Sequence, residues 1–179
     1  MPCLSVYAED HPQQPYKVLG LPEHISAELA RVGVHYAHCL PEQALGAAPA
    51  EAEVVAAYQS SVQPLRELSG YQQLQLIRQP AEQPTGGECH AQCLDEHSHA
   101  GAEVHLFVAG QALIGLHAAG MVYELICEKG DALVIPAGTR HWFDGGEPAH
   151  WVAIRLLGSA EDASVKLSGD PIASRFSRL

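Results

Sequence analysis

The sequence predicts a mainly β protein, an antiparallel barrel or jelly roll with N-terminal helices packed outside it. From Tyr71 onward, short apolar runs are separated by Gly, Asp or Pro, a pattern typical of antiparallel barrels. Before that point, apolar residues recur at helical spacing. The 179 residues, 47% of them hydrophobic, suit one compact domain. We expect an extended and helical region at 1–70 and a barrel at 71–179.

Two helices are predicted in the N-terminal region. Residues 22–34, "PEHISAELARVGV", have apolar positions on one helical face and a glycine near the end. The second helix starts near Pro49 and ends before Gly70. Pro64 lies inside it, and proline lacks an amide proton and clashes with the preceding turn. We therefore expect a kink or break at 60–63.

The barrel strands are predicted from apolar runs bounded by turn residues. The segment "LHAAGMVYEL" is typical of a hairpin, and "CEKGDAL" of a tight turn. The runs of strand length are "YQQLQLIRQ", "EVHLFVAG", "QALIGLHAAGMVYELICEKG", "DALVIPAG" and "HWVAIRLL".

Net charge and composition limit the kinds of partner that this protein is expected to bind. The chain has 10 Lys and Arg against 21 Asp and Glu, a formal charge of −11 that repels phosphate backbones, so we expect no nucleic-acid partner. It has no apolar run long enough to cross a membrane and no signal-peptide pattern at its start. We expect a cytoplasmic monomer that does not bind a membrane.

The cysteines do not indicate a disulfide framework. Their number, 5, is odd, their spacing is irregular, and no export signal accompanies them, so reduced thiols are expected. Cys89, His90 and Cys93 are weak candidates for a soft metal site, because a closed zinc site needs a fourth ligand and the sequence has no second cysteine pair nearby.

A stronger metal signal lies in "EHSHAGAEVH", residues 96–105. His97 and His99 are two residues apart, so on a strand they project from the same face. The small residues that follow can bend the chain and bring the Glu103 carboxylate to the same point, and His141 follows a Pro-x-Gly turn further along. Two histidines and one carboxylate suit a divalent transition metal with open positions, of the iron or nickel kind, and His141 is a fourth candidate ligand. The remaining histidines considered are expected to be surface or hydrogen-bonded residues: His24, His35, His38, His90, His117 and His150.

These residues match the two motifs of the cupin superfamily. The first, H-x-H followed by Glu and Gly, is met by His97, His99, Glu103 and Gly110; the second, Gly, P-x-G and His, is met by Gly130, Pro136, Gly138 and His141. The wider segments "CLDEHSHAGAEVHLFVAG", "VYELICEKGD", "VIPAGTRHWFDGGEP" and "SGDPIASRFSRL" resemble the acireductone dioxygenase family. The resemblance covers most of the chain and is weaker over 1–50 and 72–92. It implies a cupin-type barrel.

The resemblance also implies an activity. Members of that family bind one Fe²⁺ or Ni²⁺ through three histidines and a glutamate, for which His97, His99, Glu103 and His141 stand at the matching positions. Their substrate is a methylthio-bearing ene-diol ketone of methionine salvage, cleaved with O₂. Iron gives a keto acid and formate, whereas nickel gives a shorter acid, formate and carbon monoxide. Arg155 matches a family arginine expected to face the substrate oxygens.

One departure from the family leaves alternatives open. The family usually has an arginine where this chain has His105, which shares a strand face with Glu103 and is expected to point toward the substrate. Trp142 and Phe143 match family aromatics but also suit a barrel core, and Arg140 should point away from the site. The alternatives are a cupin metalloenzyme acting on another enediol, ketone or thiol, and a metal-binding cupin without turnover.

Overall fold

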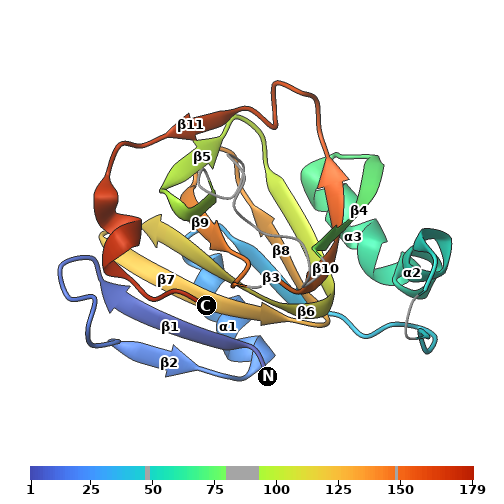
Figure 1. The fold of residues 1–179 in the computed structure, drawn as a ribbon, viewed down its shortest axis with the longest axis horizontal. Coiled ribbons are helices and arrows are strands. Elements are labelled where there is room, and N and C mark those ends of the chain that lie inside the picture. Colours follow the sequence, from blue (N-terminus) through green and yellow to red (C-terminus); the bar gives the residue numbers. More distant parts are fainter. Residues whose placement is uncertain (47–48, 80–92, 148) are drawn as a thin grey trace.

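The computed structural model describes residues 1–46, 49–79, 93–147 and 149–179. Cys89 and His90 therefore lie outside the described residues. Within the described ranges, strands predominate and all strand pairs are antiparallel, which confirms the mainly β prediction (Figure 1). No helix in these ranges is both long and apolar enough to span a bilayer.

The strands of the described ranges are arranged around β6, the longest of them. One path runs β11-β5-β9-β6-β7-β1-β2, and the other pairs β4 with β10, β10 with β6, β6 with β8 and β8 with β3. The bounds are β1 Cys3–Ala8, β2 Lys17–Leu19, β3 His35–His38, β4 Gln73–Gln79, β5 His97–His99, β6 Glu103–Ala118, β7 Met121–Glu128, β8 Asp131–Ile135, β9 Arg140–Asp144, β10 Trp151–Leu157 and β11 Val165–Leu167.

The sequence pattern predicted two strands where the structure has the single strand β6. Its first part pairs with β8 and β10, and its second part pairs with β7 and β9. Gly110 lies at the change of partners with φ +71°, and a Cβ there would meet the His150 carbonyl oxygen at 1.8 Å. The glycine therefore changes the pairing of one continuous strand instead of ending it.

The predicted hairpin is confirmed between β6 and β7. Ala118 pairs with Met121, so the loop consists of Ala119 and Gly120, whose φ angles are 53° and 73°. Two positive φ angles are typical of the type I′ turn, whose twist matches that of the flanking strands.

The helices α1 (Pro22–Ala30), α2 (Glu51–Ala57) and α3 (Gln59–Ser69) follow the predicted helical regions. The predicted break is present but lies at Tyr58, just before the expected 60–63 segment. Pro64 is inside α3. Residues 1–70 also contribute β1, β2 and β3 to the sheets, which the sequence pattern did not indicate.

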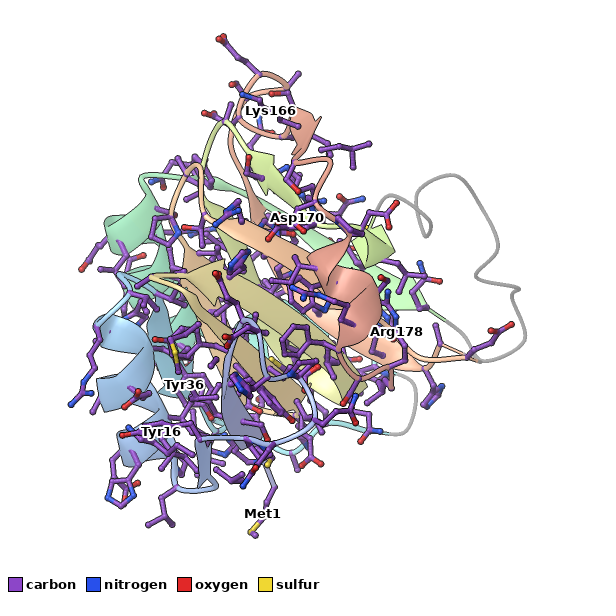
Figure 2. All side chains as sticks on the ribbon, turned by 90° about the vertical axis from the view of Figure 1, so that its left-hand side faces the viewer. Met1, Tyr16, Tyr36, Lys166, Asp170 and Arg178 are labelled. Atoms are coloured by element: carbon purple, nitrogen blue, oxygen red, sulfur yellow. The ribbon has the colours of Figure 1, made fainter. Side chains whose placement is uncertain are left out.

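Three clusters of buried apolar side chains hold the strands and helices together. The barrel interior includes Phe107, Leu133 and Trp151. A second cluster packs α2 and α3 against the outer face of β6, β8 and β10, and a third packs the C-terminal segment against β7 and β9. Figure 1 shows α2 and α3 beside β4 and β10, and the 3₁₀ helix η1 (Pro171–Arg175) on the opposite side. In Figure 2, Lys166 of β11 lies at the end of the molecule opposite Met1 and Tyr16.

Candidate metal centre

Three histidines from two neighbouring strands converge at one end of the barrel. His97 and His99 project from β5, and His141 on β9 is the direct pairing partner of His97. One ring nitrogen from each of the three lies within 4.8 Å of the other two. Alternation along β5 and the β5–β9 register therefore bring these side chains together, as the residue spacing predicts.

Each of these rings has its Nδ1 atom on a backbone carbonyl. The acceptors are the carbonyl oxygens of Asp95 for His97 (2.8 Å), Thr139 for His141 (2.8 Å) and Ala163 for His99 (3.3 Å). Because a carbonyl oxygen only accepts, Nδ1 must carry the proton, which leaves Nε2 with a free lone pair. This arrangement fixes the tautomer that binds a metal through Nε2.

The carboxylate of Glu103, at the start of β6, completes the set. Its Oε2 atom lies 2.7 Å from His141 Nε2 and 3.5 Å from His99 Nε2, whereas its Oε1 atom lies 2.7 Å from His105 Nε2. Burial alone would raise the pKa of Glu103, but attraction to His105 and the contacts with His105 and His141 outweigh it. The pKa of this carboxyl is therefore held well below its ordinary value, and the group is an anionic oxygen donor.

The histidine environments differ. Burial lowers the pKa of His97, which favours the neutral ring that a metal requires. Burial also acts to lower the pKa of His141, but the adjacent Glu103 carboxylate, the Thr139 carbonyl and the charge of Glu96 together outweigh it, and the pKa is raised.

The residues present fit a divalent transition metal. His141 Nε2 is buried, and the approach of Glu103 lacks hydrogen-bond geometry, so this nitrogen has no hydrogen bond among the described residues. A buried ring nitrogen in this state needs another partner, and a metal ion would provide one. Three imidazole nitrogens and one carboxylate oxygen are donors that iron and nickel accept.

A pocket adjoins the centre on the side of β10. Its lining includes His99, Glu103, Arg155, Asp162 and Ala163. Arg155 is the register partner of His105 across β10 and β6, so both side chains leave the same face of the sheet. Within the described ranges the Arg155 side chain has no hydrogen bond or ion pair to a protein group, and its charge is available to an anionic ligand.

The neighbours of His141 on β9 point in different directions. Phe143 faces the barrel interior, where its ring lies 6.3 Å from that of His105. Trp142 is fully buried on the outer face, against Phe176. Arg140 is directed away from the centre, as predicted, with a guanidinium nitrogen 3.7 Å from Glu96.

His117 is hydrogen-bonded, as expected, but sequence reasoning did not identify its partners, which lie in a partly buried network behind the centre. His117 is hydrogen-bonded through Nδ1 to Glu96 and through Nε2 to Glu9, at 2.9 Å. Glu96 directly precedes His97, so strand alternation aims it at the opposite face. That parity was available in the sequence, but the pairing with His117 depends on tertiary contact.

Comparisons with known proteins agree with this geometry. The model of the ARD/ARD' family matches residues 7–164. Acireductone dioxygenases of Pseudomonas paraeruginosa and Stutzerimonas stutzeri are 41% and 42% identical over 179 residues, covering 100% of this chain and 99% of each relative. A solved acireductone dioxygenase from Bacillus anthracis, with a cadmium ion in its active center, has a TM-score of 0.77 at 20% identity, over 93% of this chain and 98% of that one, which confirms the expected cupin-type fold. The chain therefore belongs to the ARD/ARD' family, a family of acireductone dioxygenases.

Proposed function

We propose that this protein is a metal-dependent dioxygenase that cleaves the acireductone 1,2-dihydroxy-3-keto-5-methylthiopentene with O₂ in methionine salvage. With Fe²⁺ the products would be the keto acid and formate, and with Ni²⁺ a shorter acid, formate and carbon monoxide. Family membership supports the reaction class. The observation that carries the proposal is the convergence of three histidine nitrogens with the Glu103 carboxylate.

In this proposal His97, His99, Glu103 and His141 hold one Fe²⁺ or Ni²⁺. When bound, the metal would supply positive charge that favours the deprotonated form of an enediol substrate, and that electron-rich form can reduce O₂ without an external reductant. The carbonyl groups behind the histidine rings keep their Nε2 atoms aimed at the ion.

Arg155 and His105 are the proposed substrate-facing residues. Arg155 lines the pocket beside His99 and Glu103, and its guanidinium stays charged at all working pH values. A charge-assisted hydrogen bond to a substrate oxygen stabilises the bound anion by about 1.5–3 kcal/mol. His105 lies opposite Arg155 with its Nδ1 buried and without a hydrogen bond in the described ranges, so this nitrogen is available to the substrate.

Metal exchange in a single apoprotein tests the proposal. The purified protein is stripped of metal, reloaded with Fe²⁺ or Ni²⁺, and supplied with acireductone while O₂ uptake, formate and carbon monoxide are measured. We expect O₂ uptake with both metals and carbon monoxide only with nickel. Absence of O₂ uptake with either metal would contradict the assignment, and would favour a cupin metalloenzyme for another substrate or a metal-binding cupin without turnover.

The proposal also places the protein in the cytoplasm as a monomer without a nucleic-acid or membrane partner. The net charge of −11 supports the absence of a nucleic-acid partner, because it opposes binding to phosphate backbones. Size-exclusion chromatography with light scattering, on protein loaded with metal, would measure the oligomeric state.

A further inference from the structure

The two oxygens of the Glu103 carboxylate have different surroundings. Oε2 faces the histidine nitrogens, 2.7 Å from His141 Nε2 and 3.5 Å from His99 Nε2. Oε1 instead lies 2.7 Å from His105 Nε2. Because an ionised carboxylate only accepts hydrogen bonds, His105 Nε2–H is the donor. One oxygen of Glu103 is thus directed at the metal centre, and the other already accepts a hydrogen bond from His105.

The His105 ring is held in place on several sides. It is 5% exposed, so it has little room to move. Its plane is nearly parallel to the rings of Phe107 (centroids 6.1 Å apart, 27° between planes) and Phe143 (6.3 Å, 28°). On the flanking strands its register partners are Leu133 and Arg155. Packing therefore fixes the direction in which Nε2–H points.

We propose that His105 is a positioning residue that keeps Glu103 a one-oxygen ligand. An octahedral ion held by three nitrogens and one oxygen has two open positions, whereas a glutamate bound through both oxygens would leave one. A substrate with two adjacent oxygens needs two positions to chelate. The hydrogen bond to Oε1 opposes rotation of the carboxylate into two-oxygen binding and so preserves the second position. This inference deepens the proposed function and rests on its metal site.

The test compares two small probes on Ni²⁺-loaded protein in place of turnover. Acetohydroxamate binds a metal through two oxygens, whereas azide needs one position. The variant His105→Phe keeps an aromatic ring between Phe107 and Phe143 but lacks the N–H donor, and His105→Gln restores an N–H donor. His38→Phe is the matched control, because it removes another histidine–carboxylate contact, to Asp131 at 2.9 Å, outside the metal centre.

We expect His105→Phe to bind acetohydroxamate about 10- to 100-fold more weakly than the wild type, a loss of the same size as the loss of metal affinity or activity that follows removal of an outer hydrogen-bond partner of a metal ligand. Azide affinity should be unchanged, His105→Gln should recover acetohydroxamate binding, and His38→Phe should match the wild type. X-ray absorption of the nickel should detect two-oxygen carboxylate binding only in His105→Phe.

Each remaining outcome decides the inference. Equal weakening of both probes, or no weakening of either, would overturn it. Loss of Ni²⁺ from both His105 variants would also overturn it, since the ring itself would then be required. Loss from His105→Phe alone, with normal binding by His105→Gln, would support the role of the N–H donor. A protein that distinguishes the probes as expected but does not consume O₂ with acireductone would sustain this inference and contradict the proposed function.

Discussion

At the scale of single residues, the metal centre depends on donors that have few other partners. His141 Nε2 is buried and lacks a hydrogen bond in the described ranges. We expect His141→Ala to weaken Ni²⁺ binding by more than the about 10- to 100-fold that loss of an outer hydrogen-bond partner costs. Competition with a chelator measures this. His35→Ala, which removes an exposed histidine on β3, should bind Ni²⁺ like the wild type, and equal affinities in both variants would contradict the assignment.

A second residue-scale prediction concerns the glycine behind Trp142. A Cβ at Gly115 would lie 2.0 Å from the Trp142 indole, which is fully buried and cannot move aside. We expect Gly115→Ala to reduce the free energy of unfolding by about 1–3 kcal/mol, seen as a lower melting temperature. Gly46→Ala is the control, because a Cβ there meets no atom of the described residues within 4 Å. Equal melting temperatures of the two variants would contradict this packing.

At the scale of elements, α3 has one face on the barrel and one in solvent. Leu65 is 2% exposed and packs on the outer face of the sheets, whereas Leu68 is 55% exposed. Leu65→Ala should lose about 2–5 kcal/mol of unfolding free energy through the cavity it leaves, and Leu68→Ala should change it by no more than about 0.5 kcal/mol. Urea denaturation measures both. Both variants should bind one Ni²⁺ per chain, because the apolar cluster between α3 and the sheets lies outside the barrel. Loss of metal by Leu65→Ala would show that packing of α3 on the barrel affects the metal centre.

The C-terminal segment is attached to β7 through Glu124, whose Oε1 accepts the Ser177 amide at 2.9 Å. Burial raises the pKa of Glu124 above its ordinary value of 4.5. Since the folded state favours the protonated form, this group supports stability below pH 4.5 and loses that contribution as pH rises through the raised value.

Glu124→Gln keeps a hydrogen-bond acceptor but has no ionisation. The melting temperature of Glu124→Gln minus that of the wild type should therefore be larger at pH 7 than at pH 4. Thermal unfolding in buffers of matched ionic strength measures the difference. A difference that does not change with pH would contradict the buried position of this carboxyl.

At the scale of the whole molecule, the donors come from β5, β6 and β9, and only the folded chain brings them together. Metal binding should therefore stabilise the fold, by about 2.7 kcal/mol at a free metal concentration 100 times the Kd. We expect Ni²⁺ to raise the melting temperature of the wild type and a chelator to reverse the increase. An equal increase in His141→Ala would mean that the ion stabilises the protein at another site.

Much of this architecture could be predicted from local pattern. Alternation along a strand placed His97 and His99 on one face, and the segment "LHAAGMVYEL" indicated a hairpin. These features depend on residues close in sequence. The candidate donors were also identifiable, because their spacing matches the two cupin motifs.

Only the tertiary structure decided how distant segments meet. It made β6 continuous across Gly110, brought β1 and β3 into the sheets, and placed Arg155 opposite His105. It also gave the two oxygens of Glu103 different partners. Strand register and side-chain direction in a barrel are set by packing and hydrogen bonding summed over several strands at once. A local pattern defines which residues share a face, but not which residues of another strand that face will contact.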